Sequence, residues 1–397
     1  MTAAAQLISS PRSARAMSGT ESGQQLGASP QVLQEEEHQA EPEGDHAGGE
    51  DDVGGYELGS LGDDVDGDDG DDAVGEEVGR GLSIGASQNM AYTDGKKTLH
   101  LVGVGVKHSI APPMHNHIAE SLGLPWTFHS TECPALDNLM TLARSEETAG
   151  LVVTMPYKNT VMARLDRLDE LATTIGACNN VYHDPTDYSK LVGTNTDWLG
   201  IKGSLLEKGD QDTRPKLVDS SKPALLVGAG GASRAAVYAL STQLFSTTIY
   251  VLNRDDEEVE HLIRNTARVE PRPTIIHVKS LEQASSLDTP YYVVGTVPDF
   301  PPTTEAEKTV AAVMEHFLSR SAKGVVLDMC FKPRRTRMIK LAERLGWPTV
   351  EGTHVIGYQI EKQWRLWAGK ERAAKLDSEG AWKVLLRAAE ESPGINF

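Results

Sequence analysis

The chain has 397 residues, 39% of them hydrophobic and 24% charged, which is ordinary for a globular protein of two or three domains. Its net charge of −19 is unevenly distributed along the chain, because residues 1–80 hold 20 of the 57 acidic residues but only three arginines, a net charge of −17. Residues 81–397 are therefore nearly neutral, which speaks against a nucleic-acid partner, and no apolar run approaches the roughly 20 residues of a membrane helix. The three cysteines lack the spacing of a metal site and indicate a reducing compartment, so we expect a cytoplasmic protein without a bound metal.

Residues 1–92 are expected to form a disordered acidic tail. The stretch from Gly49 to Glu77 is mostly Asp, Glu and Gly, so it cannot bury enough apolar surface to offset chain entropy. The composition leaves two interpretations open, a solubilising extension or an acidic arm that binds a partner.

From Thr98 onward, short apolar runs alternate with helical patterns, which predicts an α/β fold with parallel sheets and crossover helices. The strand-like runs are Leu99–Gly103, Gly150–Thr154, Asn179–Tyr182, Ala224–Val227, Thr248–Leu252, Tyr291–Val294 and Val325–Leu327. The helix-like segments are Pro113–Leu122, Thr160–Leu171, Ala232–Leu244, Asp256–Arg264 and Ala306–Ser319. The polar stretch Gly209–Pro223 indicates a loop near a junction, so we place a first domain at 97–198 and a second at 199–352. The segment His354–Gly369 is apolar at helical spacing and must pack against another part of the fold.

The run from Ala224 to Arg234 is a buried strand, a glycine turn and the start of a helix, which predicts a Rossmann-type dinucleotide site. Glycines let the backbone turn tightly and approach a pyrophosphate, which the helix N-terminus attracts. The next strand ends roughly 20 residues further on, where the group that contacts the ribose belongs. The predicted cofactor-binding residues are Gly228, Gly230, Gly231, Ala232, Ser233, Asn253, Arg254 and Asp255.

The choice between NAD and NADP stays open on the sequence. Arg254 would hold the 2′-phosphate of NADP or stack on adenine, whereas Asp255 would repel that phosphate or accept from the ribose hydroxyl of NAD. Asp255 equally suits the N-cap of the following helix. Because the aspartate offsets the arginine, the pair favours NAD.

Hydride transfer to or from a carbonyl needs a proton partner near the reacting oxygen. Lys158 and Asp197 both follow strand-like runs, where α/β proteins place residues that handle ligands. A lysine beside a carboxylate can move a proton, although the pattern alone also fits two surface charges.

Seven motifs, in order across about residues 98–370, resemble those of the shikimate/quinate dehydrogenase family, in its fungal quinate/shikimate dehydrogenase-like form. They are Gly105–Asn116, Thr154–Lys158, Ile175–Val181, Gly193–Asp197, Gly228–Arg234 with Asn253 and Arg254, Asp328–Thr336, and Gly352–Gln359 with Leu366–Gly369.

The resemblance implies a substrate-binding catalytic domain followed by a Rossmann-type NAD(P)-binding domain, in a monomer or homodimer. A C-terminal helix at 353–390 would return to the first domain. Lys158 and Asp197 would form the catalytic pair that exchanges the proton of a ring hydroxyl. Among the substrate-binding residues, Ser109 would hold the carboxylate of quinate or shikimate, and Thr154, Asn179 and Gln359 would hold ring hydroxyls.

Two positions depart from the family pattern. The family commonly has a second hydroxyl residue where this chain has Ala111, and a tyrosine where it has Phe331. Ala111 leaves room for the extra hydroxyl of quinate, or the change is drift in a shikimate enzyme. A further alternative is a catalytically silent, dehydrogenase-like ligand sensor that regulates the quinate/shikimate pathway; the intact Lys158 and Asp197 favour the enzyme.

Overall fold

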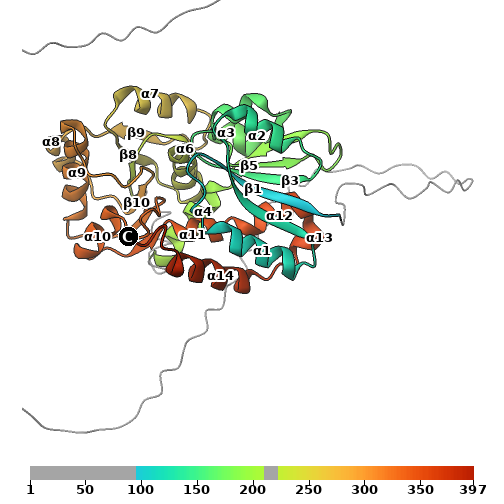
Figure 1. The fold of residues 1–397 in the computed structure, drawn as a ribbon. Coiled ribbons are helices and arrows are strands. Elements are labelled where there is room, and N and C mark those ends of the chain that lie inside the picture. Colours follow the sequence, from blue (N-terminus) through green and yellow to red (C-terminus); the bar gives the residue numbers. More distant parts are fainter. Residues whose placement is uncertain (1–94, 210–221) are drawn as a thin grey trace, which may run out of the picture. The chain divides into compact units, whose positions relative to one another are not determined.

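A computed structural model describes residues 95–209 and 222–397, which belong to one compact unit containing two six-stranded sheets (Figure 1). The acidic tail at 1–92 and most of the polar stretch Gly209–Pro223 lie outside these residues. The α/β class is confirmed, whereas the domain limits at 97–198 and 199–352 stay predictions. None of the helices in the described ranges is long and apolar enough to span a membrane.

The first sheet has the order β2-β1-β3-β5-β6-β4. Its strands are β1 (Lys97–Gly103), β2 (Trp126–Glu132), β3 (Thr148–Val153), β4 (Arg167–Leu168), β5 (Asn180–His183) and β6 (Leu191–Thr194). Neighbouring strands are parallel except that β5 runs antiparallel to both β3 and β6. The alternating pattern predicts parallel strands, and β5 differs because the short loop from His183 to Leu191 suits antiparallel neighbours, whereas a parallel pair needs a long crossover.

The second sheet is parallel throughout, in the order β12-β11-β10-β7-β8-β9. Its strands are β7 (Ala224–Val227), β8 (Thr248–Leu252), β9 (Thr274–His277), β10 (Tyr292–Gly295), β11 (Val325–Asp328) and β12 (Thr349–Glu351). Strand β7 is apolar at every position because both of its faces are covered: Leu226 packs into one core and Leu225 into the other. From β7 the chain adds strands first on one side, as β8 and β9, and then on the other, as β10 to β12. The boundary between β7 and β10 is therefore the switch point at which such sheets bind ligands.

The helices before the second sheet are α1 (Ala111–Ser121), α2 (Leu136–Ala143), η1 (Thr160–Arg164), α3 (Glu170–Ile175) and α4 (Asp197–Lys208). Those within it are α6 (Gly231–Tyr238), η2 (Ala239–Gln243), α7 (Asp256–Asn265), α8 (Leu281–Ser285), α9 (Glu305–Leu318) and α10 (Arg337–Arg344). Two predicted helices are divided. Thr160–Leu171 is interrupted by β4, after which the Asp169 side chain caps α3, and Ala232–Leu244 changes from α6 to the π-helical η2.

The C-terminal segment, predicted as one helix at 353–390, is four helices. They are α11 (Thr353–Gly357), α12 (Ile360–Ala368), α13 (Lys370–Ala373) and α14 (Ser378–Glu391). Gly369 ends α12 at a φ of 88°, a conformation that an L side chain rarely adopts. The segment returns to the first sheet, where Trp364 and Leu385 share a core with Leu99 and Ile118. Figure 1 shows it in orange and red beside α1.

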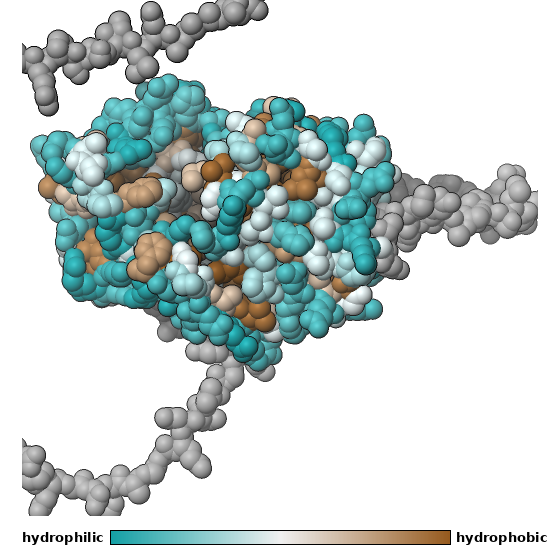
Figure 2. Space-filling model, in the orientation of Figure 1, coloured by the Kyte–Doolittle hydropathy of each residue, from teal (hydrophilic) through white to brown (hydrophobic). Residues whose placement is uncertain are grey.

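The surface follows the amphipathic pattern of its helices. On the face seen in Figure 2, hydrophilic residues cover most of the area, and hydrophobic residues form small separate patches. Helix α7 is an example, because Val259 and Leu262 are buried while Asp256, Glu257 and Glu260 are exposed.

His115 on α1 is part of the core beneath the first sheet. Its side chain is 1% exposed, stacks on Phe128 with ring centroids 4.1 Å apart, and accepts at Nδ1 from the indole of Trp364 at 3.1 Å. Burial lowers the pKa of His115 to about 3, so the imidazole is neutral and structural.

This burial predicts a pH-dependent contribution to stability. Between pH 6.5 and about 3 the unfolded chain binds a proton at His115 and the folded chain does not. The free energy of unfolding therefore decreases as the pH falls through this range. His115→Asn keeps the acceptor for Trp364 and removes the titration. When the pH is lowered from 7.5 to 4.5, the free energy of unfolding of the variant should therefore rise by about 2 kcal/mol relative to that of wild type, as measured by denaturant unfolding.

Ile118→Val, on the same helix, removes buried volume without a titratable group and is the control, since its destabilisation should be equal at both pH values. Parallel pH profiles for wild type and His115→Asn would contradict the prediction.

Candidate active site

The reversal of β5 brings three strand ends together. Asn179 directly precedes β5, and because this strand is antiparallel, its start lies beside the carboxyl ends of β3 and β6. The Val153 amide donates to the Asn179 carbonyl at 2.7 Å, and the Asn179 amide donates to the Thr194 carbonyl at 3.1 Å. Lys158 follows β3 and Asp197 follows β6, so both lie next to Asn179.

Lys158 and Asp197 form an ion pair at this edge. Asp197 is 4% exposed, and a buried carboxylate is costly unless it is paired and hydrogen-bonded. One carboxylate oxygen accepts from Lys158 Nζ and the other accepts from Asn179 Nδ2 at 2.9 Å. The Asp197 backbone amide donates to Asn195 Oδ1 at 3.0 Å. The lysine is thus tied to a carboxylate that is itself fixed in place.

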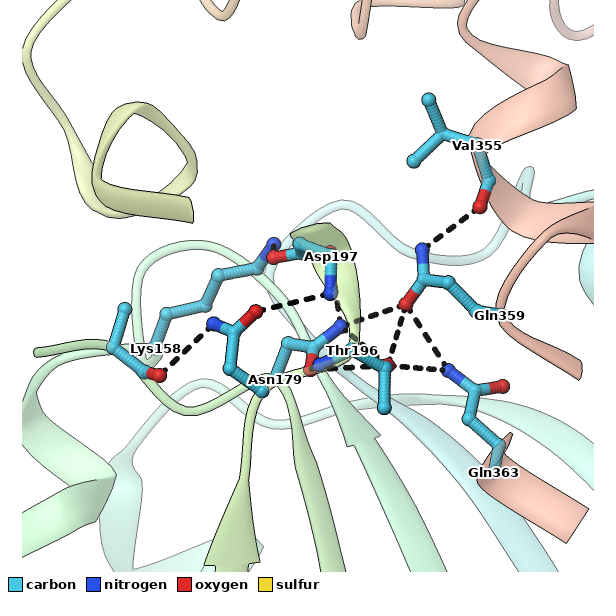
Figure 3. A network of polar contacts seen from close by, with 9 residues as sticks. Lys158, Asn179, Thr196, Asp197, Val355, Gln359 and Gln363 are labelled. Atoms are coloured by element: carbon cyan, nitrogen blue, oxygen red, sulfur yellow. Dashed lines mark hydrogen bonds and ion pairs between the residues drawn. The ribbon is translucent and has the colours of Figure 1, made fainter. Parts of the chain in front are cut away.

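Gln359 joins this pair through a network of side-chain amides (Figure 3). Its Oε1 accepts from Asn179 Nδ2 at 2.9 Å, from Thr196 Oγ1 at 2.6 Å and from Gln363 Nε2 at 3.3 Å. Its Nε2 donates to the Val355 carbonyl at 2.9 Å. Thr196 and Gln363 were not among the predicted site residues. Thr196 lies inside one of the seven motifs, and Gln363 follows Gln359 by four residues, the spacing that places two side chains on one helix face.

Thr154 directly follows β3, and Ser109 lies in the segment that connects the neighbouring strand β1 to α1. The Ser109 hydroxyl accepts from the Ala111 amide at 3.2 Å, and the Thr154 amide donates to the Val102 carbonyl at 2.9 Å. A Cβ added at Gly103 would lie 2.5 Å from the Thr154 methyl group, so these two segments pack closely. Among the described residues, neither hydroxyl bonds to the amide network. The other predicted catalytic and substrate-binding residues are joined to one another directly.

The glycine turn after β7 has the shape of a dinucleotide cradle. Gly228 has a φ of +116°, and a Cβ there would lie 2.4 Å from Thr296 Oγ1, so a side chain is excluded. A Cβ at Gly230 would project into open space, where a pyrophosphate can approach the N-terminus of α6. Ser233 Oγ lies 2.8 Å from Thr296 Oγ1, so this small residue links the helix to β10. The residues present therefore fit a dinucleotide at the switch point.

The glycine turn lies directly beside the lysine segment. A Cβ added at Gly231 would lie 3.4 Å from the Lys158 Cβ and 3.3 Å from Asn159 Oδ1. Arg234, on the same helix, donates to the Gly176 carbonyl at the end of α3. The glycine turn and the predicted catalytic lysine thus lie side by side, and Asn159, which also lies here, was not among the predicted residues.

The predicted ribose-contacting residues at the end of β8 make local bonds. Asp255 caps α7, with its carboxylate accepting from the amides of Glu257 at 2.8 Å and Glu258 at 3.1 Å, which confirms the N-cap interpretation. Asn253 Nδ2 donates to Glu258 Oε2 at 2.8 Å. Arg254 forms an ion pair with Glu307. The part played by each toward a cofactor stays a prediction.

The thiols near the motifs are not poised to react. Burial raises the pKa of Cys178 to about 12 and also raises that of Cys330, so both stay protonated near neutral pH. Across residues 95–209 and 222–397, no group of three or more His, Cys, Asp or Glu side chains is arranged to hold a metal ion.

Comparison with known proteins agrees with this geometry. Residues 101–181 match the model of the shikimate dehydrogenase substrate binding domain. The quinate dehydrogenase of Emericella nidulans is 34% identical to this chain over 298 residues, which cover 70% of this chain and 90% of that protein. The chain belongs to the shikimate/quinate dehydrogenase family. It is an enzyme, an NAD(P)-dependent oxidoreductase.

The chain is also similar to part of a longer polypeptide and to a solved structure. The pentafunctional AROM polypeptide of Eremothecium gossypii is 35% identical over 281 residues, which cover 69% of this chain but only 17% of that polypeptide. The structure of shikimate 5-dehydrogenase from Thermus thermophilus, in complex with NADP(H) and shikimate, is 26% identical with a TM-score of 0.56. That match covers 74% of this chain and 99% of the other.

The position of Gln359 depends on close packing between α4 and α11. A Cβ added at Gly200 would lie 2.5 Å from the Val355 carbonyl oxygen, and one at Gly203 would lie 2.4 Å from the Tyr358 ring. The glycines of α4 thus allow α11 to approach the helix that begins with Asp197. Because Val355 also accepts from Gln359, this contact helps to place the glutamine.

Gly200→Ala should therefore destabilise the enzyme by about 1–3 kcal/mol, the usual cost of overpacking, as measured by chemical unfolding. The sign is informative because alanine is otherwise the better helix former. Gly230→Ala is the matched control for stability, since its Cβ enters open space at a φ of −81°. Equal stability of Gly200→Ala and wild type would show that the two helices can separate without cost.

Proposed function

We propose that this enzyme interconverts quinate and 3-dehydroquinate, or shikimate and 3-dehydroshikimate, by hydride transfer with NAD(P). The observation that carries the proposal is the Lys158–Asp197 pair, which lies directly beside the glycine turn. The similarity to the quinate dehydrogenase of Emericella nidulans supports quinate, and the similarity to the Thermus thermophilus enzyme in complex with shikimate supports shikimate.

The proposed chemistry divides between cofactor and protein. When bound, the nicotinamide supplies or accepts the hydride at the ring carbon. Lys158 gives a proton to the carbonyl oxygen as the ketone is reduced, and takes the proton of the hydroxyl when the alcohol is oxidised. Asp197 holds the lysine amine toward that oxygen and balances its charge while the proton is present.

Neutral hydrogen-bonding groups suit a polyhydroxylated ring. We propose that Thr154, Asn179 and Gln359 bind ring hydroxyls and that Ser109 binds the carboxylate. The amides of Asn179 and Gln359 bond to each other at 2.9 Å, so ring hydroxyls would exchange with bonds that already exist in the protein. Discrimination against an analogue that lacks a hydroxyl would arise where binding of the ring breaks one of these bonds and the missing hydroxyl then leaves an amide unpaired.

We further propose NAD as the preferred cofactor, because Asp255 places a carboxylate next to Arg254 at the end of β8. A carboxylate there repels the two negative charges of a 2′-phosphate. Action in the cytoplasm, as a monomer or homodimer on a small-molecule substrate, is part of the same proposal.

Initial-rate kinetics with quinate and shikimate, each against NAD and NADP, test the function. Lys158→Ala should lower kcat by roughly 10²–10⁴-fold, the usual effect of losing a positioned acid–base group. Asp197→Asn should lower it comparably, and the double variant should lose little more, because the pair acts as a unit.

Lys202→Ala, on α4 outside the network, is the control for the loss of a lysine. A Lys158→Ala enzyme that stays within about threefold of wild-type kcat would remove the proton role, since that loss is far below the acid–base scale. Binding of a ring acid without turnover in any cofactor combination would favour the ligand sensor instead.

Ala111→Ser tests the interpretation of substrate choice. If Ala111 makes room for the extra hydroxyl of quinate, the added hydroxyl should raise kcat/KM for shikimate relative to quinate. A hydrogen bond from the serine hydroxyl to the substrate carboxylate would contribute about 1.5–3 kcal/mol, so the ratio of the two kcat/KM values should change at least several-fold. Ala111→Gly, which adds no donor, is the control. An unchanged ratio in Ala111→Ser would show that this position does not contact the substrate.

A further inference from the structure

Arg254 is held by an acidic residue from a distant part of the chain. It follows β8 directly, the place where a Rossmann fold holds the ribose of its dinucleotide. Its guanidinium bonds to Oε1 of Glu307, 53 residues further along the chain in the first turn of α9. Arg254 is largely exposed, with 63% of its side chain accessible, whereas Glu307 is 22% accessible.

Glu307 is fixed in this orientation by its own helix end. Its other oxygen, Oε2, accepts from the amides of Thr303 at 2.8 Å and Thr304 at 2.9 Å and from the Thr303 hydroxyl at 2.9 Å. The Glu307 amide donates back to Thr304 Oγ1 at 3.2 Å, which completes a capping box. Oε1 is therefore directed at Arg254. The amides of Thr304 and Thr303, and then Arg254, hold the pKa of Glu307 well below its usual range, so it is a carboxylate.

Three neighbouring polar residues in the described part of the chain have partners of their own. Asn253 donates to Glu258, Asp255 caps α7, and Lys279 pairs with Asp256 at 2.7 Å. Arg254 is thus the cation next to the ribose position that a 2′-phosphate would need, and a dianionic phosphate would have to displace the Glu307 carboxylate to reach it.

We propose that Glu307 is a specificity-determining residue for the cofactor: it occupies Arg254 and so disfavours the 2′-phosphate of NADP. The inference rests on the proposed cofactor site and names the residue that sets its preference. It locates the discrimination in an ion pair between the end of β8 and α9, rather than in Asp255 alone.

The test compares 2′,5′-ADP with 5′-AMP, two probes that differ only in the 2′-phosphate, by titration calorimetry. Glu307→Gln keeps the capping box, because glutamine serves at that position, and removes the charge that holds Arg254. The variant should bind 2′,5′-ADP at least about tenfold more tightly than wild type, since a charge-assisted contact with the guanidinium becomes available. Its affinity for 5′-AMP should change by less than about threefold, because that probe lacks the group Arg254 contacts.

Glu305→Gln is the matched control, since Glu305 lies in the same helical turn, is 90% exposed and pairs with Lys308 instead. It should leave the affinity for 2′,5′-ADP near that of wild type, and adding Arg254→Leu to Glu307→Gln should abolish the gain. An equal gain in Glu305→Gln, or a gain that persists without Arg254, would overturn the inference. If 5′-AMP and NAD bind but Glu307→Gln changes nothing, the inference alone fails; if no nucleotide binds the wild type, the proposed cofactor site fails with it.

Discussion

The structure of the site depends on satisfying one buried carboxylate. Asp197 is almost without solvent and yet charged, which is tolerable only if its oxygens are paired and hydrogen-bonded. Its partners come from separate elements: Lys158 from the segment after β3 and Asn179 from the start of β5. Gln359 then satisfies Asn179 from the C-terminal segment. A charge that could not be buried without these contacts thus draws together residues spread over some two hundred positions of the chain.

Close backbone approach is the second requirement of the site. Helix α11 can lie against α4 because Gly200 has no side chain, and the glycine turn lies against Lys158, where a Cβ at Gly231 would be 3.4 Å from the Lys158 Cβ. A larger residue at Gly200 would push α11 away from α4, because its Cβ would lie 2.5 Å from the Val355 carbonyl oxygen. The contacts at the glycine turn join the second sheet to the first beside Lys158, and Arg234 reinforces the same junction by donating to the Gly176 carbonyl at the end of α3. Through this packing, Gly200 would contribute indirectly to the proposed chemistry.

Two acidic residues near the predicted ribose position stabilise helices, and we propose that they also act on the cofactor. Asp255 and Glu307 cap the N-termini of α7 and α9, where negative charge is favourable because of the exposed amides and the helix dipole. Glu307 also pairs with Arg254, and Asp255 follows Arg254 directly in the chain, so both carboxylates would reduce the positive potential that a bound phosphate meets there. On the proposed cofactor site, the same side chains would link the stability of these two helices to the choice of cofactor.

Local pattern in the sequence determined the α/β class, the limits of β7 and β8 and the glycine turn, because burial on both faces and special backbone angles leave a residue-level signature. Their positions after strand-like runs singled out Lys158 and Asp197, and the motif resemblance predicted their pairing and added Asn179 and Gln359. Tertiary structure alone decided the antiparallel β5, the division of the C-terminal segment into four helices, and the pairing of Arg254 with Glu307. Strand direction depends on which neighbours a loop can reach. An ion pair between residues 53 positions apart leaves no periodic pattern in the sequence from which it could be predicted. Such contacts exist only once the chain has packed, since they are set by distances in space rather than by spacing along the sequence.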